Sequence, residues 1–184
     1  VFRYLAILII VAGFYELYKL FRESGFMHRK FFVLSVIIYT SFAIGFIIFS
    51  TMDTGLMLFT FLILSIFDSF SQITGQLWGR RKLIPQISPQ KTVEGLIGGI
   101  LTGILSVVIL RELIPMPSDE AILLALGIIA FAFVGDISTS YYKRNYHAKD
   151  FSNFIPGHGG FLDRFDSLIA GGAWISLISI IVKF

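Results

Sequence analysis

Charged and flexible residues are concentrated in one stretch of the sequence, between its last two long apolar runs. Residues 143–150 and 156–166 together hold four basic side chains, three carboxylates and four glycines or prolines. Two membrane helices can be joined by a few polar residues, so topology alone does not require this density of charge. The composition of the stretch predicts a site that binds anions and a metal ion at a membrane face.

Two carboxylates lie at the start of the final apolar run. Asp163 and Asp166 are three residues apart and therefore share one face of a helix. Carboxylates also suit the positive end of a helix dipole, so capping is the alternative explanation, above all for Asp163. A hard ion such as Mg²⁺ takes oxygen ligands and is completed by water and substrate phosphates, so two or three Asp residues would suffice. We predict Mg²⁺ bound together with a nucleotide.

Two further carboxylates lie inside apolar runs. Asp68 falls within the third run, and Asp136 falls near the end of the fifth. A charge at the centre of a membrane helix costs roughly 2.5 to 3.5 kcal/mol on insertion scales, and less near a helix end. Each residue therefore needs a partner, which is either water, a serine hydroxyl or a bound cation. We favour a cation for both.

The loop at 156–160 combines glycines with a histidine. Gly159 and Gly160 let the backbone approach a ligand closely and free N–H groups to contact phosphate oxygens. His158 has three possible roles: a general acid or base, a phosphate donor, or a loop residue hydrogen-bonded to backbone. Zinc is not expected, because the three histidines are dispersed and the chain has no cysteine.

A second candidate for anion binding precedes the fourth apolar run. Thr92 is placed as the N-cap of the helix that follows, so Lys91 stands at a helix N-terminus, with Ser88 just before it. A positive side chain beside unpaired N–H groups suits a phosphate, and a solvated charge is the alternative. The segment is not a Walker sequence, because the glycine-rich lead is absent.

The elements that must position these residues are membrane helices. The chain has 184 residues, of which 55% are hydrophobic, and its mean hydropathy of +0.81 is too high for an ordinary soluble domain. No segment shows the alternating pattern of a membrane β-barrel. We expect an all-α, polytopic membrane helical bundle in one domain, 1–184, in which 1–60 supply amino-terminal helices and 61–184 the catalytic helices and loops. The predicted spans are 1–20, 31–50, 55–73, 93–113, 120–142 and 165–184.

Basic residues follow the first, third and fifth spans, and few lie on the other side. The positive-inside rule therefore predicts that the candidate site faces the cytoplasm and that both chain ends lie outside. The basic residues at 80–82 either mark this topology or bind anionic headgroups. The first span lacks a cleavage site and should remain in the membrane. Because Val1 is not an initiator Met, we expect further residues upstream.

Three other features limit the function. Gly95, Gly99 and Gly103 recur every fourth residue, which predicts close packing between helices. The absence of cysteine excludes disulfides and thiolate chemistry. The 20 Phe residues are spread through the spans as lipid-facing or core side chains, so nucleic-acid binding has no support.

Four blocks of the sequence carry a resemblance to a known family. They are Asp68-Ser69 with Gly75 and Trp78-Gly79; Ser88-Pro89-x-Lys91-Thr92-x-Glu94-Gly95-x-x-Gly98-Gly99; Gly135-Asp136; and Ser140-x-x-Lys143-Arg144-x4-Lys149-Asp150-x5-Pro156-x-His158-Gly159-Gly160-x-x-Asp163-Arg164-x-Asp166-Ser167. Taken in order, they resemble the CDP-diacylglycerol synthase, or phosphatidate cytidylyltransferase, family. The match covers 68–172, and the first sixty residues contribute only hydropathy.

The resemblance implies an enzyme of phospholipid biosynthesis in a bacterial-type cytoplasmic membrane. Such an enzyme joins CTP to phosphatidate, gives CDP-diacylglycerol and pyrophosphate, depends on Mg²⁺ and is a homodimer. Whether a monovalent cation accompanies Mg²⁺ is open. By motif match, Asp136 and Asp163 would hold the metal with Asp68 nearby; Lys91, Lys143, Arg144 and Arg164 would contact phosphates; and Ser88, Thr92, His158, Gly159 and Gly160 would line the pocket.

Two alternatives remain at this point. A CTP-dependent kinase of a lipid alcohol would need similar cations, together with a base for the hydroxyl group. A transporter or channel could instead line an ion path with Asp68 and Asp136. Against the transporter, the carboxylates accompany the motifs on the predicted cytoplasmic side, while the opposite connections carry little chemistry.

Overall fold

The computed structural model describes residues 2–152 and 159–182 and confirms the helical bundle. Six of its helices are long and apolar enough to cross a membrane. The elements, in chain order, are α1 (Phe2–Glu23), α2 (Arg29–Phe49), α3 (Thr54–Trp78), β1 (Lys82–Ile84), β2 (Ser88–Thr92), α4 (Val93–Leu110), the short 3-10 helix η1 (Arg111–Leu113), α5 (Ser118–Asn145) and α6 (Leu162–Val182).

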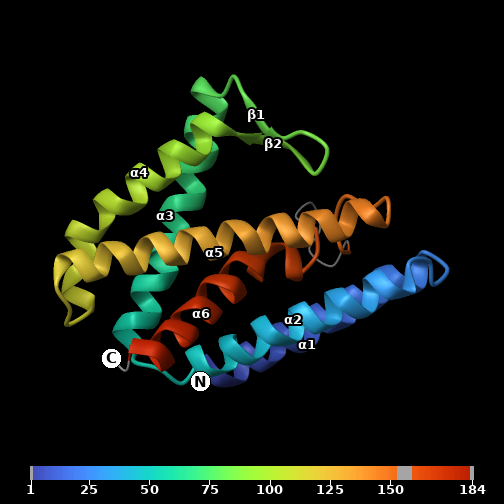
Figure 1. Ribbon diagram of the computed structural model, residues 1–184, viewed down its shortest axis with the longest axis horizontal. Coiled ribbons are helices and arrows are strands. Elements are labelled where there is room, and N and C mark those ends of the chain that lie inside the picture. Colours follow the sequence, from blue (N-terminus) through green and yellow to red (C-terminus); the bar gives the residue numbers. More distant parts are fainter. Residues whose placement is uncertain (1, 153–158, 183–184) are drawn as a thin grey trace.

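The helices are arranged as consecutive membrane spans require. In Figure 1, α1 and α2 lie side by side, α6 lies between them and α5, and α3 and α4 form a second pair. The chain ends and the connections α2–α3 and α4–α5 lie toward the left and lower left. The α1–α2 turn, the β-hairpin and the carboxyl end of α5 lie toward the right and top. The segments that carry the candidate site are thus gathered away from the chain ends.

Several helices extend beyond the predicted apolar runs. Helix α3 continues past residue 73 to Trp78, α5 continues past 142 to Asn145, and α6 begins at Leu162 rather than at 165. Most of the added residues are polar or charged, which is why hydropathy alone did not include them. Residues 82–92, predicted only as a loop ending in a helix cap, form a two-stranded antiparallel hairpin in which Lys82 pairs with Thr92. Pro89 is tolerated there because a two-stranded sheet has only edge strands.

Small residues hold α4 against its neighbours. A Cβ atom on Gly95 would lie 2.7 Å from the Ser71 carbonyl oxygen, and one on Gly99 would lie 2.9 Å from the Phe67 carbonyl oxygen. A Cβ on Gly103 would meet the Ile129 side chain at 2.7 Å. Real side chains do not tolerate such distances, so only glycine allows these helices to approach so closely. The predicted packing role of all three glycines is confirmed.

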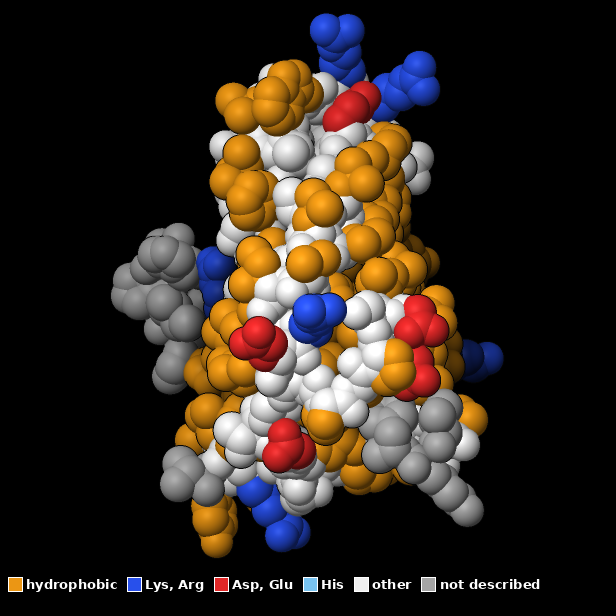
Figure 2. Space-filling model, turned by 90° about the vertical axis from the view of Figure 1, so that its left-hand side faces the viewer, with side chains coloured by type: hydrophobic (Ala, Val, Ile, Leu, Met, Phe, Trp, Pro, Cys, Tyr) orange, Lys and Arg blue, Asp and Glu red, His pale blue; other side chains and the backbone are white. Residues whose placement is uncertain are grey.

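Apolar side chains fill the space between the other helices. Phe46, Phe59, Ile63, Ile128 and Ile175 are fully buried at the centre of the bundle. Outside this core, many large apolar side chains of the spans are exposed, as expected where lipid replaces water. Figure 2 shows hydrophobic side chains covering much of one face, with acidic and basic side chains in a few separate groups.

Candidate active site

A polar cavity of about 610 Å³ lies between α3, the hairpin, α5 and α6. It brings together five of the predicted site residues, which are far apart in the sequence. Its polar lining consists of Asp68, Ser71, Gln72, Gln76, Lys82, Ser88, Gln90, Lys91, Thr92, Asp136 and Ser167. Cationic, anionic and neutral polar groups therefore face one space, bordered by the apolar side chains of Phe67, Leu96 and Phe133.

An ion pair between Lys91 and Asp136 crosses this cavity. The Lys91 ammonium contacts one Asp136 carboxylate oxygen directly and lies 4.8 Å from the centroid of the Phe133 ring. The Lys91 and Asp136 side chains are 25% and 32% exposed. Asp68 lines the same cavity. A cation and two carboxylates thus share one partly open space.

The local fold explains why Lys91 faces the cavity. Thr92 is the N-cap of α4, and its buried hydroxyl accepts a hydrogen bond of 3.1 Å from the Gly95 N–H, as predicted. The Glu94 carboxylate accepts bonds of 3.0 and 3.1 Å from the backbone N–H groups of Arg80 and Arg81. These contacts tie the residues just before β1 and the end of β2 to the start of α4. Lys91 stands directly before that junction.

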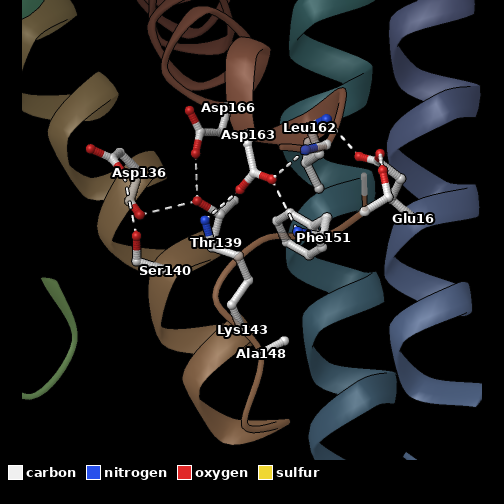
Figure 3. Close-up of polar contacts among 12 residues, drawn as sticks. Glu16, Asp136, Thr139, Ser140, Lys143, Ala148, Phe151, Leu162, Asp163 and Asp166 are labelled. Atoms are coloured by element: carbon white, nitrogen blue, oxygen red, sulfur yellow. Dashed lines mark hydrogen bonds and ion pairs between the residues drawn. The ribbon is translucent and has the colours of Figure 1, made fainter. Parts of the chain in front are cut away.

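A second cluster lies where α5 and α6 meet (Figure 3). Lys143 and Asp163 form an ion pair of 2.5 Å, and only about a tenth of each side chain is exposed. The other Asp163 carboxylate oxygen accepts hydrogen bonds from the N–H groups of Phe151, at 3.0 Å, and Gly160, at 2.8 Å. Within the described part of the chain, neither Lys143 nor Asp163 lines the polar cavity. The structure thus distributes the predicted site over two clusters, and a metal role for Asp163 stays a prediction.

One face of α5 connects the two clusters. Asp136, Thr139, Ser140 and Lys143 follow one another at helical spacing, and in Figure 3 Thr139 lies between Asp136 and Asp163. The Thr139 hydroxyl donates to the buried carboxylate of Asp166 at 2.5 Å and lies 3.0 Å from the Asp136 carbonyl oxygen. The Ser140 hydroxyl is 3.4 Å from an Asp136 carboxylate oxygen. A change at either cluster can therefore reach the other through a single helix.

The remaining predicted residues surround these clusters. Arg144 donates to the carbonyl oxygens of Ile87, at 2.9 Å, and Ala148, at 3.0 Å, so it links the turn of the hairpin to the segment after α5. Gly159 has a φ of +81°, a left-handed conformation that favours glycine. Arg164 is exposed in the first turn of α6. His158 lies outside the described residues.

Glu16 is the residue of this region that sequence reasoning missed. It lies about two turns before the end of α1 and is only 3% exposed, yet it accepts hydrogen bonds from residues at the start of α6. A signal was present, because a carboxylate within an apolar run is costly and needs a partner. The same argument singled out Asp68 and Asp136.

The side chains that line the polar cavity suit Mg²⁺, which substrate phosphates and water complete, better than a metal ion bound by protein ligands alone. Among residues 2–152 and 159–182, no three His, Asp or Glu side chains form a group that could hold a metal ion. Mg²⁺ is usually bound through one or two carboxylates and completed by substrate phosphates and water. The two carboxylates that line the cavity, Asp68 and Asp136, satisfy that requirement.

A second cavity, of about 240 Å³, lies between α1, α2, α5 and α6. Its lining is mostly apolar and includes Leu34, Ile38 and Phe42. Thr139 and Asp166 are among its few polar residues, so it adjoins the same face of α5. Most residues that line this second cavity are therefore apolar, whereas most residues that line the first are polar.

Comparison with known proteins agrees with these features. The sequence model of the Cytidylyltransferase family matches residues 1–182. Proteins named phosphatidate cytidylyltransferase include one from Staphylococcus epidermidis, 38% identical over 150 residues, which are 79% of this chain and 56% of the relative. One from Bacillus subtilis is 41% identical over 104 residues, 55% of this chain and 39% of the relative. The chain spans about half the length of the curated relatives it matches. It belongs to the Cytidylyltransferase family.

Proposed function

We propose that this chain transfers a cytidylyl group from CTP to phosphatidate, giving CDP-diacylglycerol and pyrophosphate. A phosphatidate oxygen attacks the α-phosphorus of CTP, and the bond from that phosphorus to the oxygen bridging to the β-phosphate breaks. The observation that carries the proposal is the polar cavity, in which Lys91 and two carboxylates face one space in a chain of this family. Both reactants are anionic, so the site must chiefly position them and offset their repulsion.

Each group of residues has a part in this reaction. Lys91, Lys143, Arg144 and Arg164 contact phosphate oxygens, and Ser88, Thr92, His158, Gly159 and Gly160 line the pocket. Mg²⁺, held by Asp68 and Asp136, would neutralise phosphoryl oxygens when bound. Asp163, which lies in the second cluster, is a proposed further ligand. Lys91 and Lys143 are paired with Asp136 and Asp163, which holds these cations at the site.

The membrane setting completes the proposal. The mostly apolar cavity beside α5 suits the acyl chains of phosphatidate, and the polar cavity suits the nucleotide. We place the site at the cytoplasmic face, because the basic connections after the first, third and fifth spans gather there by the positive-inside rule. We also propose that the protein is a homodimer.

The experiment uses the full chain in mixed micelles of detergent and phosphatidate, with Mg²⁺ and CTP labelled in the cytosine ring or at the γ-phosphate. Cytidylyl transfer carries ring label into lipid and leaves the γ-phosphate in pyrophosphate. A CTP-dependent kinase would carry only the γ-label into lipid. Failure of the ring label to enter lipid would contradict the proposal.

Site variants sharpen this assay. Asp163→Asn should lower incorporation of ring label, because it removes a carboxylate from the predicted metal and phosphate site. Asp119→Asn is the matched control, since Asp119 is exposed in the first turn of α5, at the opposite end of that helix. If Asp163→Asn retained the wild-type rate, the assignment of Asp163 would be wrong even if the cytidylyl transfer itself were observed.

A further inference from the structure

Glu16 is a buried carboxylate within a membrane helix, and its hydrogen-bond partners lie more than 130 residues away in the sequence. Its Oε1 accepts from the Phe161 N–H at 2.8 Å and from the Ser152 hydroxyl at 2.5 Å. Its Oε2 accepts from the Leu162 N–H at 2.6 Å. A buried carboxylate is retained at acceptable cost when its oxygens are hydrogen-bonded in this way.

Glu16 and Asp163 act on the same short segment from opposite sides. Asp163 accepts from the Gly160 N–H and the Phe151 N–H, whereas Glu16 accepts from the next two N–H groups after Gly160 and from the Ser152 side chain. Residues 151–152 and 160–162 are therefore held at one place by two carboxylates. Figure 3 shows Glu16 on α1 directed toward Leu162, with Asp163 on the far side of this segment.

The charge of Glu16 suits its position. Helix α6 begins at Leu162, and its first N–H groups form the positive end of the helix dipole. A carboxylate that accepts backbone N–H groups there forms charge-assisted hydrogen bonds, which are stronger than neutral ones. Glu16 therefore fixes both the place and the direction of the first turn of α6, in which Asp163 is the second residue.

We infer that Glu16 is a positioning residue, through which α1 fixes the orientation of Asp163 and completes the candidate active site. The effect on catalysis rests on the proposed function; the effect on the start of α6 does not. A merely structural tie between α1 and α6 would change the amount of folded protein. A positioning role changes, in addition, how the folded protein responds to Mg²⁺.

The first experiment measures hydrogen exchange in the full chain in lipid nanodiscs, comparing wild type with Glu16→Gln. The amide group of Gln replaces one acceptor oxygen with a donor, so at least one N–H or hydroxyl group at the start of α6 loses its partner. The difference between charged and neutral hydrogen bonds predicts roughly tenfold faster exchange at residues 160–163. Exchange in α3 and α4 should not change.

Glu23→Gln is the matched control for this experiment. Glu23 is on the same helix, but its side chain is 59% exposed and it pairs only loosely with Lys19, at 3.8 Å. Wild-type exchange at 160–163 in Glu16→Gln, or the same increase in Glu23→Gln, would overturn the inference. This readout does not depend on any enzymatic activity.

The second experiment measures cytidylyl transfer as a function of Mg²⁺ concentration. Glu16→Gln should lower kcat roughly tenfold and raise the Mg²⁺ concentration for half-maximal rate, with little change in the KM for CTP, because Glu16 does not line the polar cavity. Glu16→Asp keeps the charge and should restore part of the loss; it also serves as the test variant if Glu16→Gln does not fold. An unchanged Mg²⁺ response in a folded, active variant would overturn the positioning role. An inactive wild type would instead reject the proposed function. The hydrogen-exchange rates at residues 160–163 would then still test whether Glu16 positions the start of α6.

Discussion

The ion pair between Lys91 and Asp136 offers the most informative perturbation of the polar cavity. Lys91→Met removes the ammonium group but keeps an apolar side chain beside the Phe133 ring. Asp136→Asn removes the opposite charge with almost no change in shape. Because the pair bridges the hairpin junction and α5, each substitution tests both the stability of the fold and the proposed binding of CTP.

The magnitudes of these two effects differ. The pair is partly exposed, so the loss of one partner should lower the free energy of unfolding by only about 1 kcal/mol. A hydrogen bond from a charged group to a phosphate contributes roughly 1.5 to 3 kcal/mol. Since about 1.4 kcal/mol corresponds to a factor of ten, kcat/KM should fall by roughly tenfold to 150-fold in Lys91→Met.

The double variant Lys91→Met/Asp136→Asn separates the two roles. Neither charge is left unpaired in it, so its stability should return toward that of the wild type, while its activity should stay low because both groups are needed by the substrates. Thermal unfolding in detergent and incorporation of ring-labelled CTP into lipid measure the two quantities. Lys19→Met, a change at a partly exposed residue of α1, is the control. A double variant that regains activity together with stability would refute the reasoning, because the pair would then be only structural.

Three further predictions follow from the packing and from the metal. Thr92→Ala should lower the free energy of unfolding by about 1 kcal/mol, because the Gly95 N–H loses its hydrogen-bond acceptor. Thermal unfolding measures this loss, and Thr92→Ser should restore the stability. Gly99→Val should destabilise the α3–α4 pair by roughly 1 to 3 kcal/mol, since its Cβ would lie 2.9 Å from the Phe67 carbonyl oxygen; an unchanged melting temperature would contradict the close packing. Chelation of divalent ions should abolish cytidylyl transfer and added Mg²⁺ should restore it, whereas full activity in EDTA would reject the metal role.

The membrane helices could be predicted from the sequence because hydropathy and length report directly on spans. Their ends could not, because a helix can continue into polar sequence until its backbone turns. Helix α3 continues through Gln76 and ends only where Gly79 adopts an extended conformation. The hairpin was missed for another reason: β1 has only three residues, and the tie of the hairpin to α4 depends on Glu94, whose contacts with the Arg80 and Arg81 N–H groups no local pattern reveals.

The site was predicted in part. The prediction that Asp68, Lys91 and Asp136 carry chemistry is consistent with their position in one cavity, because charges in apolar runs and at helix starts need partners wherever they lie. The separation of Asp163 from that cavity could not be foreseen, because it depends on backbone N–H groups of Phe151 and Gly160 that only the folded loop brings to its carboxylate. The partners of Glu16 depend in the same way on how α1 packs against α6.

The most direct test of the central claim asks whether CTP occupies the polar cavity. The chain has no cysteine, so a single one can be introduced at Gln90, which is exposed and lines the cavity, or, as a control, at Met27 in the α1–α2 turn. Alkylation of Gln90→Cys should slow about tenfold in Mg²⁺ and CTP at ten times the dissociation constant, whereas Met27→Cys should react at its unliganded rate. Equal alkylation of Gln90→Cys with and without CTP and Mg²⁺ would contradict the assignment of this cavity as the nucleotide site.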